Sequence, residues 1–435
     1  MADLPAPLSV GTCLVALLAI SLTMPACGEV EADPDWPLDS GAASSDADTQ
    51  GADAGGAPPD GASPQHDADG ELRQDITEDI DDDRTLDADV LYRVTESIDI
   101  NAMLTIEPGT RLEFERQADF VVRSDGIFVA EGTEADPIVF TGVDQEPGSW
   151  NGLAFRGSEA PENVLGHVII EYAGRQPLAG NDDAANLTIG GGILRNGLVT
   201  VTNAIIRHSA AHGIYMSERG SLSGFEGNLI TSNASAPIAL PASELGHLDT
   251  DSSYGDNGDE VILVAGARID LDGTWHQLEI PYKMVGNTDI RDAVVTIDAG
   301  ARLEFDEGAQ LTLDSSDAVA IFDGSVTDPI VLTGGEEVPG YWNGLFVRNG
   351  HIQGLNHTVI EHGGREALGN GEPANLIVGD NTLRTPEVTV LDSFFRGSAG
   401  YGIWVHDAAV VNDGICDANS FENNDLGDCE IEGAD

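Results

Sequence analysis

The chain contains the same ordered set of sequence segments twice, about 190 residues apart. Four pairs show the repetition: residues 105–114 (TIEPGTRLEF) and 296–305 (TIDAGARLEF), 136–142 (DPIVFTG) and 328–334 (DPIVLTG), 147–153 (PGSWNGL) and 339–345 (PGYWNGL), and 167–175 (HVIIEYAGR) and 357–365 (HTVIEHGGR). Because the order is kept and the offset drifts by only a residue or two, the repetition is a duplication. Similarity at a fixed period is typical of repeat architectures. The duplication therefore constrains the fold more than the chemistry.

From Leu91 onward the chain consists of short apolar runs separated by Gly, Asn, Asp, Ser and Pro, and helical periodicity is scarce. Such runs are typical of β-strands, which predicts an all-β protein. A sandwich or barrel would need antiparallel hairpins, whereas a parallel β-helix stacks coils of about 20 to 25 residues. The apolar runs 204–206 and 228–230 lie about one coil apart, so the spacing favours the β-helix.

Stacked coils also predict which side chains form the interior. Asparagines at the turns can adopt left-handed backbone and bond to the main chain, and in register they would form ladders. These asparagines are Asn228 and Asn233 in the first copy and Asn419, Asn423 and Asn424 in the second. We expect Ile169 and Val359 to point into the core.

The repeated segments resemble bacterial right-handed parallel β-helix surface proteins with a pectin-lyase-like fold. The resemblance rests on residues 104–110, 126–133, 136–142, 148–153 and 185–187, and it extends over residues 84–424. It implies a solenoid of two tandem units, residues 84–240 and 281–435, with a C-terminal cap on the second and a joining segment at 241–280. It implies no fixed activity, because a fold does not determine a function.

The N-terminus predicts export. Residues 1–26 contain a short apolar run closed by small residues, which is typical of a signal peptide and too short for a membrane span. Cys27 directly follows and resembles the acylated cysteine of bacterial lipoproteins, although Met24, Pro25 and the lack of a preceding Lys or Arg depart from that pattern. The alternative is an ordinary secretory signal. Either interpretation predicts a location in or outside the bacterial envelope, and the lipid anchor predicts the outer membrane and the cell surface.

Residues 27–83 are dominated by Ala, Gly, Asp, Ser and Pro. A segment with so little apolar area and so much like charge predicts a disordered tether that lifts the folded part off a surface. The whole chain has a formal net charge of -57. Nucleic acid is therefore not expected as a partner, because phosphate contacts need clustered Lys and Arg.

Two of the four cysteines, Cys416 and Cys429, lie close together near the C-terminus. In an exported protein, such a pair predicts a disulfide that closes the last turn of the fold, and two free thiols are the alternative.

Paired carboxylates are the usual catalytic groups of glycoside hydrolases, so Asp182, Asp183 and the nearby His212 are candidates. They match only part of the polygalacturonase signatures, and the second copy has Asn370, Gly371 and Glu372, and then Tyr401, in the corresponding places. We therefore expect a polar loop and a solvent-facing turn, and we predict no catalytic residues.

Arg175 and Arg365 follow Glu171 and Glu361 in equivalent places. A lyase could use such an arginine near a carboxylate, but duplication favours a salt bridge from each Arg that fixes a loop on the coil, because an enzyme rarely keeps two copies of one site. Trp150 and Trp342 could stack on sugar rings, but their strand context favours core packing. His167 and His357 precede strands and need no metal.

Residues 249–260 match part of a calcium-loop pattern. Asp249, Asp251, Ser253 and Glu260 occupy positions 1, 3, 5 and 12 of such a loop, but Tyr254 stands where the sharp turn requires glycine. No flanking helices are predicted, so a turn is favoured over a calcium site, and no cofactor is expected.

Together these features predict a monomeric, non-catalytic exported protein that acts in adhesion, recognition or surface structure. Its expected ligand is a polysaccharide or a surface protein. The alternative is a polysaccharide lyase or glycoside hydrolase that uses a groove on the β-helix.

Overall fold

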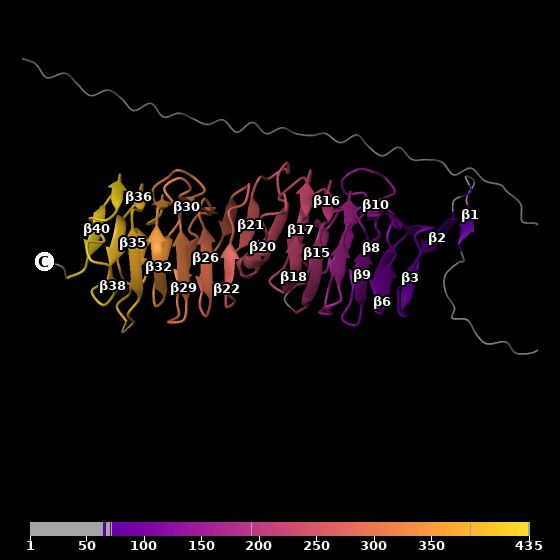
Figure 1. The fold of residues 1–435 in the computed structure, drawn as a ribbon, viewed down its shortest axis with the longest axis horizontal. Coiled ribbons are helices and arrows are strands. Elements are labelled where there is room, and N and C mark those ends of the chain that lie inside the picture. Colours follow the sequence, from indigo (N-terminus) through magenta and orange to yellow (C-terminus); the bar gives the residue numbers. More distant parts are fainter. Residues whose placement is uncertain (1–63, 67–69, 71, 193, 383, 434–435) are drawn as a thin grey trace, which may run out of the picture. The chain divides into compact units, whose positions relative to one another are not determined.

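A computed structural model describes residues 64–66, 70, 72–192, 194–382 and 384–433. The predicted signal peptide, Cys27 and most of the predicted tether lie outside these residues. The described chain is almost entirely β-strand, with one short 3₁₀ helix, η1 (Ala242–His247). Its strands follow one another along a single long axis from β2 to β40 (Figure 1). Among the described strands every pairing is parallel except that of β1 with β2, which confirms the predicted parallel β-helix.

The strands form five sheets. Sheet A contains β1 (Gln65–His66), β2 (Leu72–Ile76), β4 (Leu91–Val94), β7 (Arg111–Phe114), β10 (Ile138–Gly142), β13 (Val168–Glu171), β16 (Ile205–Arg207) and β19 (Leu229–Thr231). Sheet C contains β3 (Arg84–Leu86), β6 (Met103–Ile106), β9 (Ile127–Glu131), β12 (Val164–Gly166), β15 (Gly197–Thr202) and β18 (Gly220–Glu226). Both belong to the first copy.

Sheet B is the longest, with 13 strands that run through both copies. It contains β5 (Ser97–Ile100), β8 (Asp119–Val122), β11 (Gly152–Phe155), β14 (Ala185–Ile189), β17 (His212–Met216), β20 (Ile238–Pro241), β21 (Ile262–Ala265), β24 (Tyr282–Val285), β27 (Arg302–Phe305), β30 (Ile330–Gly334), β33 (Thr358–Glu361), β36 (Phe394–Arg396) and β39 (Ser420–Glu422).

The remaining two sheets belong to the second copy. Sheet D contains β22 (Arg268–Ile269), β25 (Thr288–Ile290), β28 (Gln310–Leu313), β31 (Gly344–Val347), β34 (Ala374–Val378), β37 (Tyr401–Val405) and β40 (Gly427–Ile431). Sheet E contains β23 (Gly273–Trp275), β26 (Val294–Asp298), β29 (Val319–Asp323), β32 (His351–Asn356), β35 (Glu387–Leu391) and β38 (Val410–Val411).

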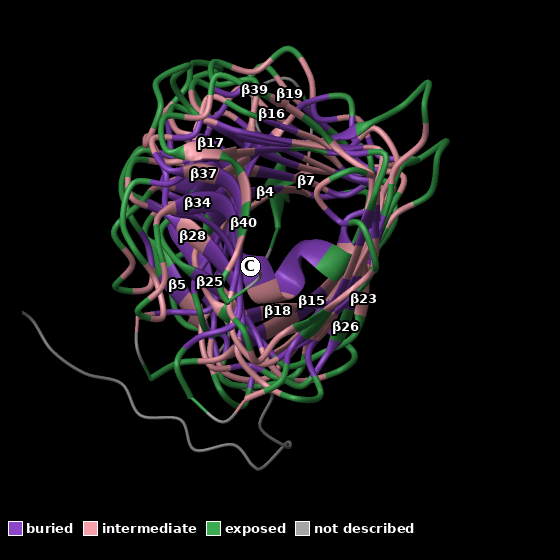
Figure 2. Ribbon diagram, turned by 90° about the vertical axis from the view of Figure 1, so that its left-hand side faces the viewer, coloured by how far each residue is buried: buried purple, intermediate pink, exposed green. Residues whose placement is uncertain are grey.

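Equivalent strands of the two copies belong to different hydrogen-bonded sheets. In the first copy each coil passes through sheets C, A and B, whereas in the second it passes through B, D and E. The duplicated sequence RLEF forms β7 in sheet A and β27 in sheet B. The change takes place where β20 pairs with β21 and β21 with β24. Equivalent strands nevertheless lie on the same side of the solenoid in the end-on view, β39 with β19 and β37 with β17 (Figure 2).

Columns of apolar side chains fill the interior of the coils. In sheet A, Leu112, Phe140, Ile170, Ile206 and Ile230 are successive register partners, and all are fully buried. Viewed end-on, buried residues line the inside of the coils, and exposed ones lie on the outer loops (Figure 2). Stacking in register lets each coil bury its apolar face on the next one.

The prediction that Ile169 and Val359 point inward is wrong. Both are half-buried, and their neighbours Ile170 and Ile360 are the fully buried residues. Side chains alternate between the two faces of a strand, so an error of one residue reverses the face.

His167 and His357 are corner residues, with φ of 46° and 45°. Both bend the chain immediately before β13 and β33, and Asn203 and Asp392 do the same before β16 and β36, with φ of 51°. His, Asn and Asp are among the non-glycine residues that most often adopt this left-handed conformation. The histidines therefore have a structural position, without any need for a metal.

Asparagines stack inside the turns. Asn186 Nδ2 donates to Asn233 Oδ1 at 3.4 Å, and Asn233 Nδ2 donates to Asn257 Oδ1 at 2.9 Å. Asn228, Asn419 and Asn424 bond instead to main-chain groups of the adjacent coil, and Asn423 adopts a left-handed φ of 55° at a corner. The predicted ladder thus forms in the first copy, and asparagine caps replace it in the second.

The ordered structure begins earlier than predicted. Strand β2 lies inside the predicted tether, and Ile76 and Ile80 are buried. Asp79 and Asp83 accept hydrogen bonds from the backbone amides of Asp99 and Met103 on the next coil, at 2.8 and 3.1 Å. The acidic run that predicted repulsion therefore satisfies main-chain donors. At the other end of the fold, a disulfide joins Cys416 to Cys429.

Candidate functional site

The three candidate catalytic residues are not assembled into a site. Asp182 and Asp183 lie exposed in a loop, and no hydrogen bond joins either of them to His212. His212 begins β17 and is only 8% exposed, so the prediction of a solvent-facing turn is wrong for this residue. Burial lowers the pKa of His212, and the charge of Asp183 partly opposes this shift. Its Nδ1 has no hydrogen-bond partner.

The salt bridge predicted for Arg365 is present, to Glu307 at 2.8 Å, whereas Arg175 has none in the described part of the chain. Glu171 and Glu361 form ion pairs with arginines of the next coil. Glu171 pairs with Arg207 at 2.7 Å, and Glu361 pairs with Arg396. The parallel register places each pair side by side on adjacent strands. The partner of each glutamate is thus a residue on the adjacent strand of the same sheet. The sequence alone did not show which residue that would be.

Three of the four candidate calcium residues form other hydrogen bonds, and the fourth, Asp251, is exposed. Asp249 Oδ2 accepts from the Gly227 amide and Glu260 Oε1 from the Asn257 amide, both at 3.1 Å. Ser253 Oγ donates to Glu279 at 2.9 Å. Within the described residues, the one group of His, Cys, Asp or Glu with ligand atoms within 4.8 Å of one another is a different one, formed by His406, Asp407 and Glu432.

The two tryptophans are core residues, as predicted. Trp150 stacks on Phe114 with ring centroids 4.0 Å apart, and Trp342 stacks on Phe305 at 4.1 Å. Both are fully buried, and each indole Nε1 donates to a main-chain oxygen at 2.8 Å. They are therefore inaccessible to a sugar ring.

Three arginines, which the sequence analysis missed, line one pocket of the first copy. Arg123 directly follows β8 and Arg156 directly follows β11, while Arg195 lies in the loop after β14. The last residues of these strands, Val122, Phe155 and Ile189, are register partners. The same corner of three successive coils therefore carries the three cations.

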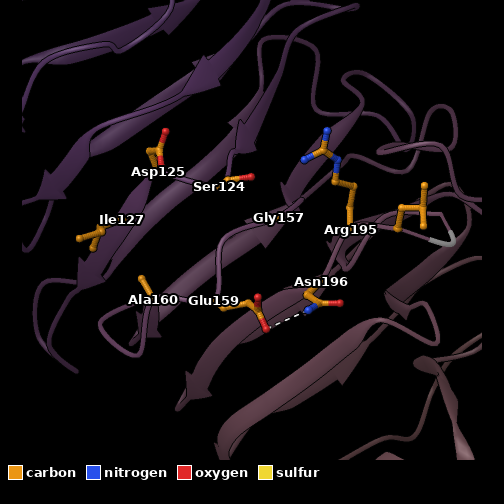
Figure 3. A pocket seen from close by; sticks show the side chains of 10 residues that line it. Ser124, Asp125, Ile127, Gly157, Glu159, Ala160, Arg195 and Asn196 are labelled. Carbon is orange, nitrogen blue, oxygen red and sulfur yellow. Dashed lines mark hydrogen bonds between the residues drawn. The ribbon is translucent and has the colours of Figure 1, made fainter.

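We call this site the arginine pocket. It has a volume of about 300 Å³ and is lined by Asp99, Asn101, Arg123, Ser124, Asp125, Arg156 and Arg195. A second pocket of about 560 Å³ adjoins it and shares Ser124, Asp125 and Arg195 (Figure 3). In that view the Arg195 side chain extends away from Glu159 and Asn196, which bond to each other at 2.9 Å.

The arginine pocket is incompletely neutralised. Arg123 pairs with Asp99 at 2.6 Å, but neither Arg156 nor Arg195 has an ion pair with a carboxylate in the described part of the chain. Burial lowers the pKa of Arg156, and the charges of Arg123 and Arg195 lower it further. The Nε atoms of Arg123 and Arg156 are buried without a hydrogen-bond partner. Unpaired guanidinium donors in a partly buried site favour an anionic ligand.

The second copy has the same corner in a neutralised form. Arg348 and Arg384 correspond to Arg156 and Arg195, but Asp314 stands where the first copy has Arg123. Asp314 accepts from Arg291, Arg348 and Arg384 at 3.0, 3.1 and 2.7 Å.

Asp380 neutralises the other side of Arg348. It corresponds to Gly191 and accepts from the Nε of Arg348 at 2.9 Å. Burial opposes ionisation of Asp380, but hydrogen bonds from Thr382 and Arg348 outweigh it and lower its pKa. The substitutions of Asp314 by Arg123 and of Asp380 by Gly191 are the sequence signal that an alignment of the two copies could have used to find the arginine pocket.

Comparison with known proteins agrees with the fold. Residues 78–195 match a family model described as a pectate-lyase-like beta helix domain. No curated protein matches the sequence significantly. Among solved structures, the periplasmic alginate epimerase AlgG aligns over 79% of this chain and 77% of its own, with 10% identity and a TM-score of 0.22. Within the described residues, none of the helices has the length and apolar character needed to cross a membrane.

Proposed function

We propose that this chain is an exported, lipid-anchored surface protein that binds an acidic polysaccharide without cleaving it. The observation that carries the proposal is the arginine pocket. Arg156 and Arg195 lack carboxylate partners in a protein whose formal net charge is -57. Elsewhere this charge repels polyanions, so an acidic chain would be held only where guanidinium groups outnumber carboxylates. The predicted signal peptide and Cys27 would place this pocket outside the cell.

A polysaccharide suits the pocket because of its position. The arginines lie on successive coils along the outer corner of a long solenoid. Extended concave or grooved surfaces are the usual binding surfaces of solenoid proteins. An extended chain could follow the corner from one coil to the next, with its acidic groups against the guanidinium groups.

One observation favours a second function, that of a polysaccharide lyase. Arg156 lies beside Arg123 and Arg195 in the pocket, and burial and these two charges lower its pKa, which is the direction that proton abstraction by a guanidine would require. The pocket lining contains no histidine, lysine or tyrosine that could serve as a partner acid. Binding without turnover is therefore the primary proposal.

The test measures binding and turnover together. The mature exported protein is applied to surfaces that carry alginate, polygalacturonate or uncharged dextran. We expect binding to at least one acidic polymer but not to dextran, and a loss of about tenfold or more for Arg156→Gln, since charge-assisted pairs contribute about 1.5–3 kcal/mol. Arg384→Gln is the matched control in the second copy and should bind as the wild type does.

Binding to dextran as tight as to both acidic polymers would contradict the proposal. If the wild type produces unsaturated or reducing ends from an acidic polymer and Arg156→Gln does not, the protein cleaves its ligand. The lyase function would then be correct in place of binding alone.

A further inference from the structure

The second copy shows how this corner is satisfied when it needs no ligand. Arg348 lies between two carboxylates, with its Nη1 3.1 Å from Asp314 and its Nε 2.9 Å from Asp380. Arg384 shares Asp314 at 2.7 Å. Two separate carboxylates therefore satisfy two adjacent arginines, and one of these arginines bonds to both.

The first copy keeps the two arginines and has lost both carboxylates. Arg156 follows β11 as Arg348 follows β31, and Arg195 lies six residues after the end of β14 as Arg384 does after β34. The position of Asp314 carries Arg123, and the position of Asp380 carries Gly191, which has no side chain. The nearby carboxylate of Asp99 is paired with Arg123, and no ion pair joins it to Arg156 or Arg195 in the described part of the chain.

From this difference we infer that the arginine pocket takes a segment with two neighbouring carboxylates. The Nε of Arg156 is buried, and Ala179 and the Arg156 side chain fill the space beside Gly191. The ligand would therefore reach the guanidinium groups from the pocket, with one carboxylate against Arg156 and the other against Arg195. The inference rests on the proposed function and narrows its ligand to a chain with paired acidic groups. A single doubly charged group, such as a phosphate monoester, shares the charge but not the two positions.

Asp99 and Asp125 narrow the choice further. Both line the pocket, so they repel an acidic group that is not held by a guanidinium. A ligand with one carboxylate would leave Arg156 or Arg195 unpaired and still meet this repulsion. A ligand with two carboxylates would neutralise both Arg156 and Arg195, as the side chains of Asp314 and Asp380 neutralise the equivalent arginines of the second copy.

The experiment measures competition by small anions at constant ionic strength. Succinate, acetate and inorganic phosphate compete with immobilised alginate for the mature protein, and calorimetry measures their direct binding. We expect succinate to compete about tenfold better than acetate, because a second charge-assisted pair is worth at least about 1.4 kcal/mol. The preference should disappear in Arg195→Gln, which removes the charge, be largely retained in Arg195→Lys, which keeps it, and persist in Arg384→Gln. A circular dichroism spectrum checks that each variant is folded.

Equal competition by succinate and acetate would overturn the inference while leaving polysaccharide binding intact. Competition by phosphate as strong as that by succinate would show that one doubly charged group is enough. That result would also overturn the inference that the pocket binds two separate carboxylates. If alginate and polygalacturonate do not bind but succinate does, and needs both Arg156 and Arg195, the inference stands and the proposed function fails.

Discussion

The two copies share their interior and differ in charge at one outer corner. Trp150 on Phe114 and Trp342 on Phe305 have nearly the same ring separation, 4.0 and 4.1 Å. Both corners have a pocket, but Arg156 and Arg195 in the first lack carboxylate partners among the described residues, whereas Asp314 pairs with three arginines in the second. Packing constrains inward side chains of stacked coils, whereas outward ones are free to diverge. We infer that recognition resides in the first copy.

The two corners also lie on different sheets. Sheet B carries the strands before the arginine pocket, and sheet D carries the strands before its neutralised counterpart. Coils of a solenoid contact mainly their neighbours, so the charges of one corner can change without disturbing the other.

Removal of a stacked tryptophan should give the largest effect, and it should be equal in both copies. Trp150→Ala and Trp342→Ala should each lower the unfolding free energy by about 3–5 kcal/mol through lost burial and a cavity. Urea denaturation monitored by circular dichroism measures both. A cost in one copy more than twice that in the other would break the claim that their interiors are equivalent.

Adjacent residues of one strand test the inward direction. Ile170→Ala and Ile360→Ala should cost about 2–4 kcal/mol, because both side chains are fully buried in the stacked column. The matched changes Ile169→Ala and Val359→Ala should cost under about 1 kcal/mol, as partly exposed positions do. Denaturation curves in which Ile169→Ala is the more damaging change would contradict the register.

These isoleucines also show how far the sequence predicts the fold. Fixed-period duplication and short apolar runs were enough for a parallel β-helix, because coil stacking is a local and repeated constraint. The prediction of the inward-facing residue was wrong by one position. The left-handed bend at His167 determines which residues of the next strand face the core, and the sequence did not show this bend. The Glu171–Arg207 pair, the change of sheet between the two copies and the arginine pocket all depend on which residues of neighbouring coils are in register. Short motifs do not contain that information.

Charge removal at the corner should affect the two copies in opposite ways. Asp314→Asn should lower the unfolding free energy by about 1–3 kcal/mol, because it leaves Arg291, Arg348 and Arg384 without a shared carboxylate. Arg156→Gln should leave stability unchanged or raise it slightly, because it removes repulsion from Arg123 and Arg195. Thermal denaturation at low salt checks both. A loss in Arg156→Gln as large as that in Asp314→Asn would mean that the first corner is also neutralised.

The smallest predicted effect concerns pH and His212, whose place Tyr401 takes in the second copy. Burial lowers the pKa of folded His212 below its unfolded value of about 6.5. The unfolded state then binds more protons, so its contribution to stability is complete above pH of about 6.5 and is lost as the pH falls toward the folded pKa. His212→Tyr should flatten that part of the stability curve. An unchanged slope between the wild type and the variant below pH of about 6.5 would show that His212 is not buried in a neutral form.

The most direct test of the central claim gives the corner of the first copy the neutralising charges of the second. Arg123→Asp combined with Asn101→Arg gives the first copy the charges that Asp314 and Arg291 provide in the second. The affinity of the folded, mature double variant for alginate or polygalacturonate, whichever the wild type binds, is compared with that of the wild type. We predict a loss of about tenfold or more, because the introduced carboxylate would pair with Arg156 and Arg195 in place of the ligand. Binding at wild-type affinity by this variant would contradict the claim that the unpaired arginines of the first copy are the recognition site.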